Sequence, residues 1–215
     1  PLYERYTPAR ANATRRRHHQ PRRGKSHRQP CVSHILGRGI IQDNQEKRAM
    51  DKDKDACWAY LIRHGATDSN LADPPILQGR GVDGPLSDEG QRQANLAANC
   101  LAPYSIAAVY SSPLKRARET AEFIAARHSL RVKTIPEIIE ADVGAWERRS
   151  WVEIRETERE SYDDFQRDPA LHGYRDGENL TEVAERVIPA IDRVMQAHRG
   201  ETIAIVGHNV VNRVL

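Results

Sequence analysis

Short runs of apolar residues recur along the chain and alternate with longer segments of helical pattern. The runs at 57–62, 106–110 and 202–206 are nearly continuous, which is typical of strands buried on both faces of a sheet. Residues 131–135 alternate as a half-buried strand does. Strands that alternate with helices favour a mostly parallel sheet covered on both faces. We therefore predict an α/β fold, a three-layer α/β/α sandwich with a mostly parallel central sheet.

The segments between these runs carry helix signals. Ser87, followed by Asp and Glu, is typical of an N-cap, and the helix should run to about residue 100. Pro113 suits the first turn of a second helix, which should end near residue 128. A short helix is expected over 150–160, and a long amphipathic helix, kinked at Pro189, over 180–198. The stretch before Ser87 is rich in Gly, Pro, Asp and Asn and predicts a loop.

The first 55 residues differ in composition from the rest. They hold fourteen Lys and Arg against six Asp and Glu, whereas residues 56–215 hold nineteen against twenty-four, within a chain of net charge +3. A basic segment with so few apolar residues cannot bury enough surface to offset the entropy lost on ordering. We predict that residues 1–55 form a disordered basic extension and that residues 56–215 form one domain.

Three roles for the extension stay open. An Arg-rich, acid-poor leader is typical of transit peptides, and a basic arm can bind nucleic acid. The third interpretation is an inert extension, which we favour because the segment has few aromatic residues for stacking on bases and no amphipathic period. We therefore do not expect nucleic acid as a partner.

Cysteine spacing and hydropathy restrict the compartment and the class of protein. Cys31, Cys57 and Cys100 are widely spaced and odd in number, which predicts neither a disulfide framework nor a metal site and fits a reducing cytoplasm. No run approaches the roughly 18 apolar residues that span a bilayer, so no membrane association is expected. No carboxylate cluster suited to Mg²⁺ is apparent, and we expect neither a metal nor another cofactor.

Two histidines, His64 and His208, directly follow predicted strands. Ligands of parallel sheets bind beyond the carboxyl ends of the strands. Arg63 beside His64 offers a fork of donors for a phosphate, and Gly65 allows a ligand to approach the backbone closely. Alone, a histidine after a strand is more often structural than catalytic, so further motifs are needed.

Such motifs follow in order along the chain. They are Arg63-His64-Gly65-x-Thr67-x-x-Asn70, Gln78-Gly79, Pro85 to Gly90, Ser111 to Ala121, and Val206-Gly207-His208-Asn209. Over residues 57–211 this set resembles the histidine phosphatase superfamily, also called phosphoglycerate mutase-like, in its R-H-G-x-T-x-x-N branch. The acid phosphatase and phytase branch has R-H-G-x-R-x-P instead.

The resemblance implies a role for each matched residue. His64 would be the nucleophile, and Arg63, Arg116 and His208 would bind the phosphate. The segment from Glu140 to Glu147 is similar to the family's E-x-x-x-G-x-W-E, which makes Glu140 the general acid, with Asp142 as an alternative. Further contacts to the substrate would come from Gly65, Thr67, Asn70, Gln78, Gly79 and Asn209.

These roles make a coherent reaction. Phosphoryl transfer depends on positioning and charge neutralisation, which two arginines and a protonated His208 would supply. A neutral His64 would attack phosphorus, and a protonated Glu140 would donate to the leaving oxygen. Water would then cleave the phosphohistidine, with Glu140 as base.

The sequence also departs from the family pattern. Arg148 follows Trp146-Glu147 where Gly is common, and Asn209 replaces a frequent Gly. The chain ends at Leu215, seven residues after His208, whereas family members usually continue with further structure. We therefore expect a C-terminally truncated fold with an incomplete core.

Three functions are compatible with these residues. Glu178 follows Glu140 by only 38 positions, as in the compact phosphatases of the family, and a short cap should admit water and favour hydrolysis of a small phosphate ester. The alternative is a 2,3-bisphosphoglycerate-dependent phosphoglycerate mutase. The third is a non-catalytic module that binds phosphate or nucleic acid. The substrate and the oligomeric state stay open.

Overall fold

The computed structural model describes residues 34–36 and 55–215, which include a five-stranded sheet of order β1-β2-β5-β3-β4. The strands are β1 (His34–Leu36), β2 (Trp58–Arg63), β3 (Ala108–Ser111), β4 (Val132–Thr134) and β5 (Thr202–Gly207). β1 is antiparallel to β2, and the other four strands run parallel to one another. The predicted mostly parallel sheet is confirmed.

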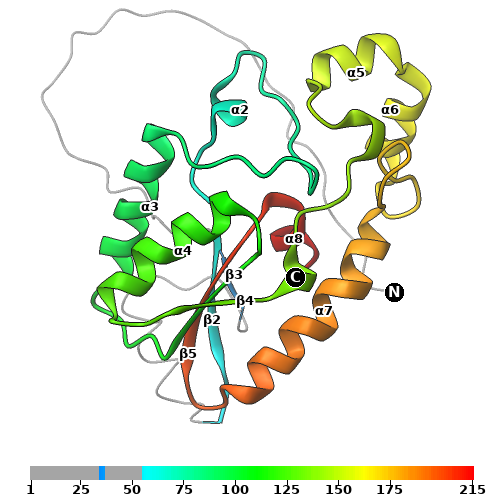
Figure 1. Ribbon diagram of the computed structural model, residues 1–215. Helices are drawn as coiled ribbons and strands as arrows, with labels where there is room; N and C mark the ends of the chain where they lie inside the picture. The colour runs from blue at the N-terminus through cyan, green and yellow to red at the C-terminus, as the bar shows by residue number, and fades with distance from the viewer. Residues whose placement is uncertain (1–33, 37–54) are drawn as a thin grey trace, which may run out of the picture.

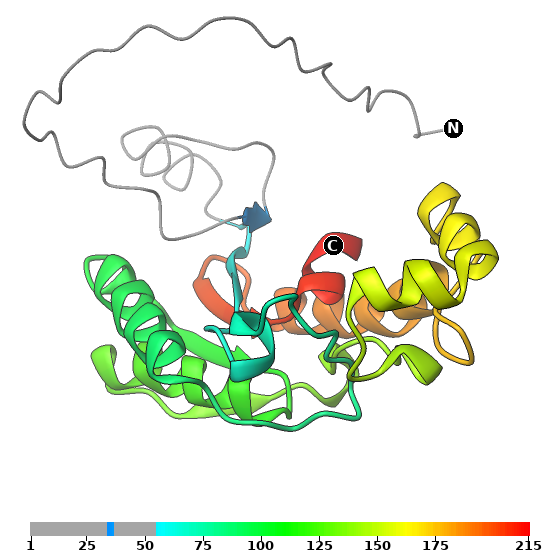
Figure 2. The same ribbon diagram turned by 90° about the horizontal axis from the view of Figure 1, so that it is seen from above.

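Helices cover both faces of the sheet (Figure 1). They are α2 (Asp68–Leu71), α3 (Asp88–Leu101), α4 (Lys115–Arg127), α5 (Trp151–Thr157), α6 (Arg159–Arg167), α7 (Leu180–Ala197) and α8 (Asn209–Val214), with 3-10 turns η1 (Pro136–Ile138) and η2 (Gly144–Trp146). Seen from above in Figure 2, α3 and α4 lie on one side of the strands and α7 and α8 on the other. The arrangement is the predicted three-layer sandwich.

Alternate residues of each strand enter different cores. Leu61 and Ile205 pack with α7 and α8, whereas Ile62 and Val206 pack with α3 and α4. This division explains why the sequence runs of β2 and β5 are apolar on both sides, since neither face meets water. None of the helices in the described ranges is long and apolar enough to cross a bilayer.

Four local predictions need correction. Residues 34–36 form a strand inside the extension predicted to be disordered; the rest of residues 1–54 lies outside the described part of the chain. The loop before Ser87 contains the short helix α2. Helix α4 starts at Lys115, so Pro113 precedes it. The single helix expected over 150–160 is two, because Glu158 ends α5 and turns its carboxylate to Trp146 and Arg175.

Gly65 and Gly90 allow the first turn of α3 to touch the loop after β2. A Cβ at Gly90 would lie 2.0 Å from the backbone oxygen of Ala66, and a Cβ at Gly65 would lie 2.4 Å from the oxygen of Gly90. Both neighbours are backbone atoms, so relief would require the helix to shift. The contact fixes α3 against the residue that follows His64.

We expect Gly90→Ala to lower the free energy of unfolding by about 1–3 kcal/mol through overpacking. The direction of this change in stability is informative, because in an exposed helix interior a Gly→Ala substitution raises the free energy of unfolding by about 1 kcal/mol. Urea or thermal unfolding measures the effect, with Gly84→Ala as control, since a Cβ at Gly84 meets nothing within 4 Å. Equal stability of the two variants would contradict this packing.

Candidate active site

The parallel pairing of β2 with β5 brings the two predicted histidines together. Arg63 lies opposite Gly207 in the register, and the backbone N–H of His64 donates to the oxygen of Gly207 at 3.1 Å. The rings of His64 and His208 are 5.1 Å apart between centroids, at 60°. Figure 1 shows α2, α5 and α6 beyond this end of the sheet. Both histidines therefore lie at the carboxyl ends of the strands, as predicted.

His64 is held in the form that a nucleophile requires. Its Nδ1 lies 2.7 Å from the oxygen of Gly65, which can only accept, so Nδ1 carries the proton and Nε2 keeps its lone pair. Burial, then the positive charges of Arg116 and Arg63, lowers the pKa of His64 to about 3. The imidazole is therefore neutral at physiological pH.

His208 is fully buried, and its Nε2 lies 2.7 Å from Oγ of Ser112. Its Nδ1 has no hydrogen-bond partner among the described residues. Burial, with the neighbouring His64 and Arg116, lowers the pKa of His208 well below its ordinary value. This shift disfavours the protonated His208 expected from sequence, because burial and the neighbouring cations oppose a positive charge on its ring. Ser112 was missed, although it follows a strand end as His64 and His208 do.

Arg116 is a fully buried cation on α4. Its Nη2 donates to the oxygen of Gly79 at 3.1 Å and its Nη1 to the oxygen of Val82, whereas Nε has no partner among the described residues. Burial lowers its pKa, and the nearby carboxylates of Glu140 and Asp83 oppose that shift. Unpaired buried polar atoms are rare in proteins, so Nε of Arg116 and Nδ1 of His208 are both available to hydrogen-bond a bound group.

Glu147 fixes the loop that holds Arg116. Its Oε1 accepts from the N–H of Gly79 at 2.6 Å and its Oε2 from the N–H of Gly81 at 3.1 Å. The carbonyls of the same loop face the guanidinium of Arg116. Glu147 was not among the residues predicted to act in the site, although it ends the Trp-Glu motif.

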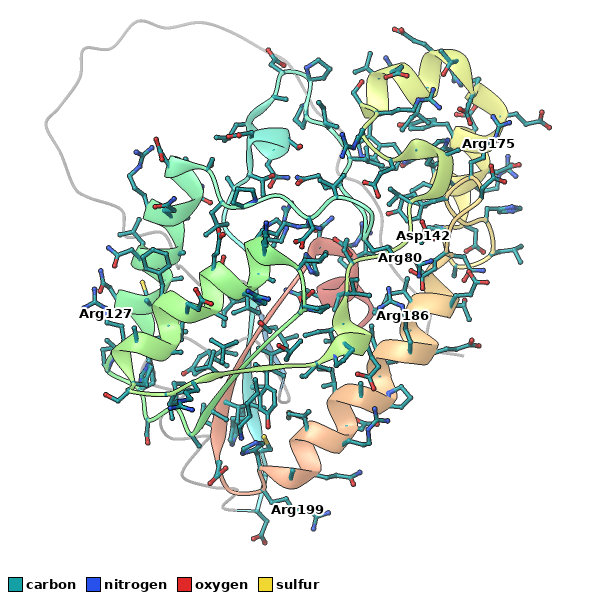
Figure 3. The ribbon with its side chains drawn as sticks, viewed as in Figure 1. Arg80, Arg127, Asp142, Arg175, Arg186 and Arg199 are labelled. Carbon is teal, nitrogen blue, oxygen red and sulfur yellow. The ribbon has the colours of Figure 1, made fainter. Side chains whose placement is uncertain are left out.

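Glu140 is buried, with 5% of its surface exposed. Its Oε1 accepts from the N–H of Ala141 at 3.0 Å, and its Oε2 lies 3.5 Å from the N–H of Val210. Burial raises the pKa of Glu140, against the opposing effect of these hydrogen bonds and of Arg116. Asp142, the alternative acid, is instead in a rim ion pair, with Oδ2 2.6 Å from Nη2 of Arg80 (Figure 3). Of the two carboxyl groups, Glu140 has the surroundings of a proton donor.

The remaining predicted residues divide into three groups. Gln78 donates to Oγ1 of Thr67 at 2.6 Å, and Oδ1 of Asn70 accepts from the N–H of Thr67 at 3.1 Å, so these three form one network. The N–H of Gly65 donates to Oγ1 of Thr120 at 3.0 Å and is committed to that contact. The side chains of Arg63 and Asn209 are exposed.

A cavity of 280 Å³ opens beside His64 and is lined on its other side by Gln93, Ala94, Leu96 and Ala97 of α3. Its lining includes Arg63 but none of Arg116, Glu140 or His208. It therefore lies on the α3 side of His64, apart from those three residues. In the described ranges, no three His, Cys, Asp or Glu side chains are grouped as a protein metal site requires.

The chain is similar to known proteins in both sequence and structure. The profile of the histidine phosphatase superfamily (branch 1) matches residues 59–215. The chain is 33% identical over 156 residues to phosphoserine phosphatase 1 of Hydrogenobacter thermophilus, over 72% of each protein. The solved structure of Bacillus stearothermophilus YhfR superposes with a TM-score of 0.68 at 32% identity, covering 74% of this chain and 78% of that one.

Other relatives are longer. The chain is 36% identical over 149 residues to the bifunctional protein Rv2228c of Mycobacterium tuberculosis. The match covers 69% of this chain but 40% of that protein. The chain thus spans less than half the length of these curated relatives.

Proposed function

The chain belongs to branch 1 of the histidine phosphatase superfamily, and from this premise we propose that it hydrolyses a small phosphate monoester through a phosphohistidine on His64. One observation carries the proposal. A neutral His64 with its Nε2 lone pair uncommitted stands beside two buried nitrogens, Nδ1 of His208 and Nε of Arg116, that have no partner among the described residues. A bound phosphate would satisfy both nitrogens.

His208 can bind phosphate as a neutral donor. Oγ of Ser112 lies 3.4 Å from the N–H of Leu114, from which it accepts, and it can donate its own proton to Nε2 of His208. The Nδ1 of His208 then carries a proton that it can donate to a phosphate oxygen. Arg116 and the exposed Arg63 supply the positive charge for the dianion.

In the first step, Nε2 of His64 attacks phosphorus and the bond from phosphorus to the ester oxygen breaks. Glu140 gives its proton to that oxygen, so the product leaves as an alcohol and not as an alkoxide. In the second step, Glu140 takes a proton from water, the hydroxide attacks phosphorus, and the P–N bond breaks. Inorganic phosphate leaves, and both His64 and Glu140 return to their initial protonation states.

The relative from Hydrogenobacter suggests where to look for the substrate. It is a phosphoserine phosphatase, and phosphoserine is a small alkyl phosphate that also carries a carboxylate. The rim of the site offers Arg80, which is half exposed and paired with Asp142. We propose phosphoserine and phosphoglycerate as the first substrates to test, with sugar phosphates for comparison.

We expect the protein to release inorganic phosphate from at least one of these esters, with the rate unchanged by EDTA. Incubation with 3-phosphoglycerate and catalytic 2,3-bisphosphoglycerate separates the alternatives. Isomerisation without net phosphate release would make the protein a mutase, and no turnover by a chain that unfolds cooperatively would leave only a binding role. Loss of the release in EDTA, restored by a divalent metal, would contradict the proposed metal independence.

A further inference from the structure

Arg186 of α7 and Glu178, just before that helix, form a bidentate ion pair beside residues 139–143, the segment that carries Glu140. Nε of Arg186 lies 2.8 Å from Oε1 of Glu178, and Nη2 lies 2.9 Å from Oε2. Their side chains are 21% and 16% exposed. Paired and partly buried in this way, the guanidinium has a fixed orientation.

Both side chains form hydrogen bonds with the backbone on either side of Glu140. Nη1 of Arg186 donates to the oxygen of Ile139 at 2.8 Å and also to that of Glu137, and Nη2 lies 3.3 Å from the oxygen of Glu140. On the other side, Oε2 of Glu178 accepts from the N–H of Asp142 at 2.7 Å. The backbone N–H of Glu178 donates to the oxygen of Asp142 at 2.8 Å. The pair therefore holds main-chain groups on both sides of the proposed acid.

These contacts matter because residues 139–143 belong to no helix or strand. Without a ladder of backbone hydrogen bonds, the position of this segment depends on the groups that bind it. In Figure 3, Arg186 of α7 lies near Asp142, and Asp142 lies beside Arg80. A displacement of about 1 Å in a catalytic group can cost about 100-fold in rate.

Resting on the proposed function, we infer that Arg186 and Glu178 are positioning residues that place the Glu140 carboxyl against the leaving-group oxygen of the substrate. A lysine at position 186 would keep the positive charge. It could not make the bidentate contact with Glu178 and at the same time donate to several carbonyl oxygens. The inference thus separates geometry from charge, which is necessary because Arg186 is also among the cations that act on His208.

The test compares two esters through kcat/KM, which reports formation of the phosphoenzyme. The alkyl ester phosphoserine (or the best alkyl phosphate found above) needs a proton on its leaving oxygen, whereas p-nitrophenyl phosphate expels a stable anion. We expect Arg186→Lys to lower kcat/KM for the alkyl ester by about 10- to 100-fold and to leave the aryl ester nearly unchanged. Glu178→Gln should show the same selectivity, and it serves alone if the Arg186 variant does not fold.

The same helix provides a matched control. Arg193 pairs with Glu137, just before residues 139–143, with Nη2 2.7 Å from Oε1. Its side chain is 64% exposed, and in the described structure it binds no backbone oxygen of residues 137–143. Arg193→Lys should behave as wild type with both esters. Glu140→Gln should discriminate between the esters at least as strongly as Arg186→Lys.

The outcomes distinguish failure of the proposed reaction from failure of the positioning role of Arg186 and Glu178. If Glu140→Gln lowers kcat/KM equally for both esters, Glu140 is not the acid and the proposed reaction fails at that step. If Glu140→Gln discriminates but folded Arg186→Lys and Glu178→Gln either match wild type or lose both esters equally, the positioning inference is overturned and the reaction stands.

Discussion

His64→Ala should abolish hydrolysis of alkyl and aryl phosphates alike, with kcat falling by at least about 10⁴-fold, the scale of loss when a catalytic nucleophile is removed. The reason is that no second group in the described site can take its place. His208 is fully buried and its Nε2 is committed to Ser112, so the two rings are not interchangeable. Initial rates of phosphate release measure the effect.

A trapping experiment separates the nucleophile from a mere phosphate ligand. Wild type quenched in alkali during turnover of ³²P-labelled ester should retain label that is lost in acid, as a phosphoramidate is, and His64→Ala should retain none. His172→Ala is the control, since His172 is a partly exposed residue of the segment between α6 and α7 whose backbone N–H donates to the oxygen of Asp168. Label or turnover that survives in His64→Ala would exclude the proposed intermediate.

The sequence predicted the strand ends well because they depend on short-range patterns. An apolar run buried on both faces defines β2 and β5, and parallel pairing then requires that the residues after each run be neighbours. The match of Arg63 with Gly207 follows from this pairing and places His64 beside His208. The N-cap at Ser87 was equally local, since its Oγ accepts from the N–H three residues on.

The sequence could not predict features set by tertiary contacts. The protonation of His208 depends on how completely α4 and the strand ends exclude water, and no periodicity reports that burial. Glu147 and Arg186 act on backbone groups more than 40 positions away in the chain. Contacts to backbone leave no residue pattern at the partner position, because any amino acid offers the same carbonyl or amide. Such residues appear in a sequence only as ordinary charges on a helix or loop.

Glu140→Gln should lower kcat/KM for an alkyl phosphate by about 10²- to 10⁴-fold, the usual contribution of a general acid. The glutamine keeps the shape and the acceptor for the N–H of Ala141 but has no proton of suitable acidity. Dephosphorylation should slow as well, since the same carboxylate acts as base. With p-nitrophenyl phosphate we therefore expect a normal burst of p-nitrophenol followed by slow turnover, measured by stopped flow.

The pH dependence gives a second, independent readout of the same group. Because burial raises the pKa of Glu140, its acid form persists above the pH at which an ordinary carboxyl has ionised, and it is lost as the pH rises through the raised value. Wild-type kcat/KM for the alkyl ester should fall over that range, and dividing by the Glu140→Gln profile removes the titration of the substrate. Asp142→Asn is the matched control, because Asp142 lies in the rim ion pair with Arg80. This variant should keep the falling limb, the decrease of kcat/KM as the pH rises. A limb that persists in Glu140→Gln and disappears in Asp142→Asn would transfer the role of acid to Asp142.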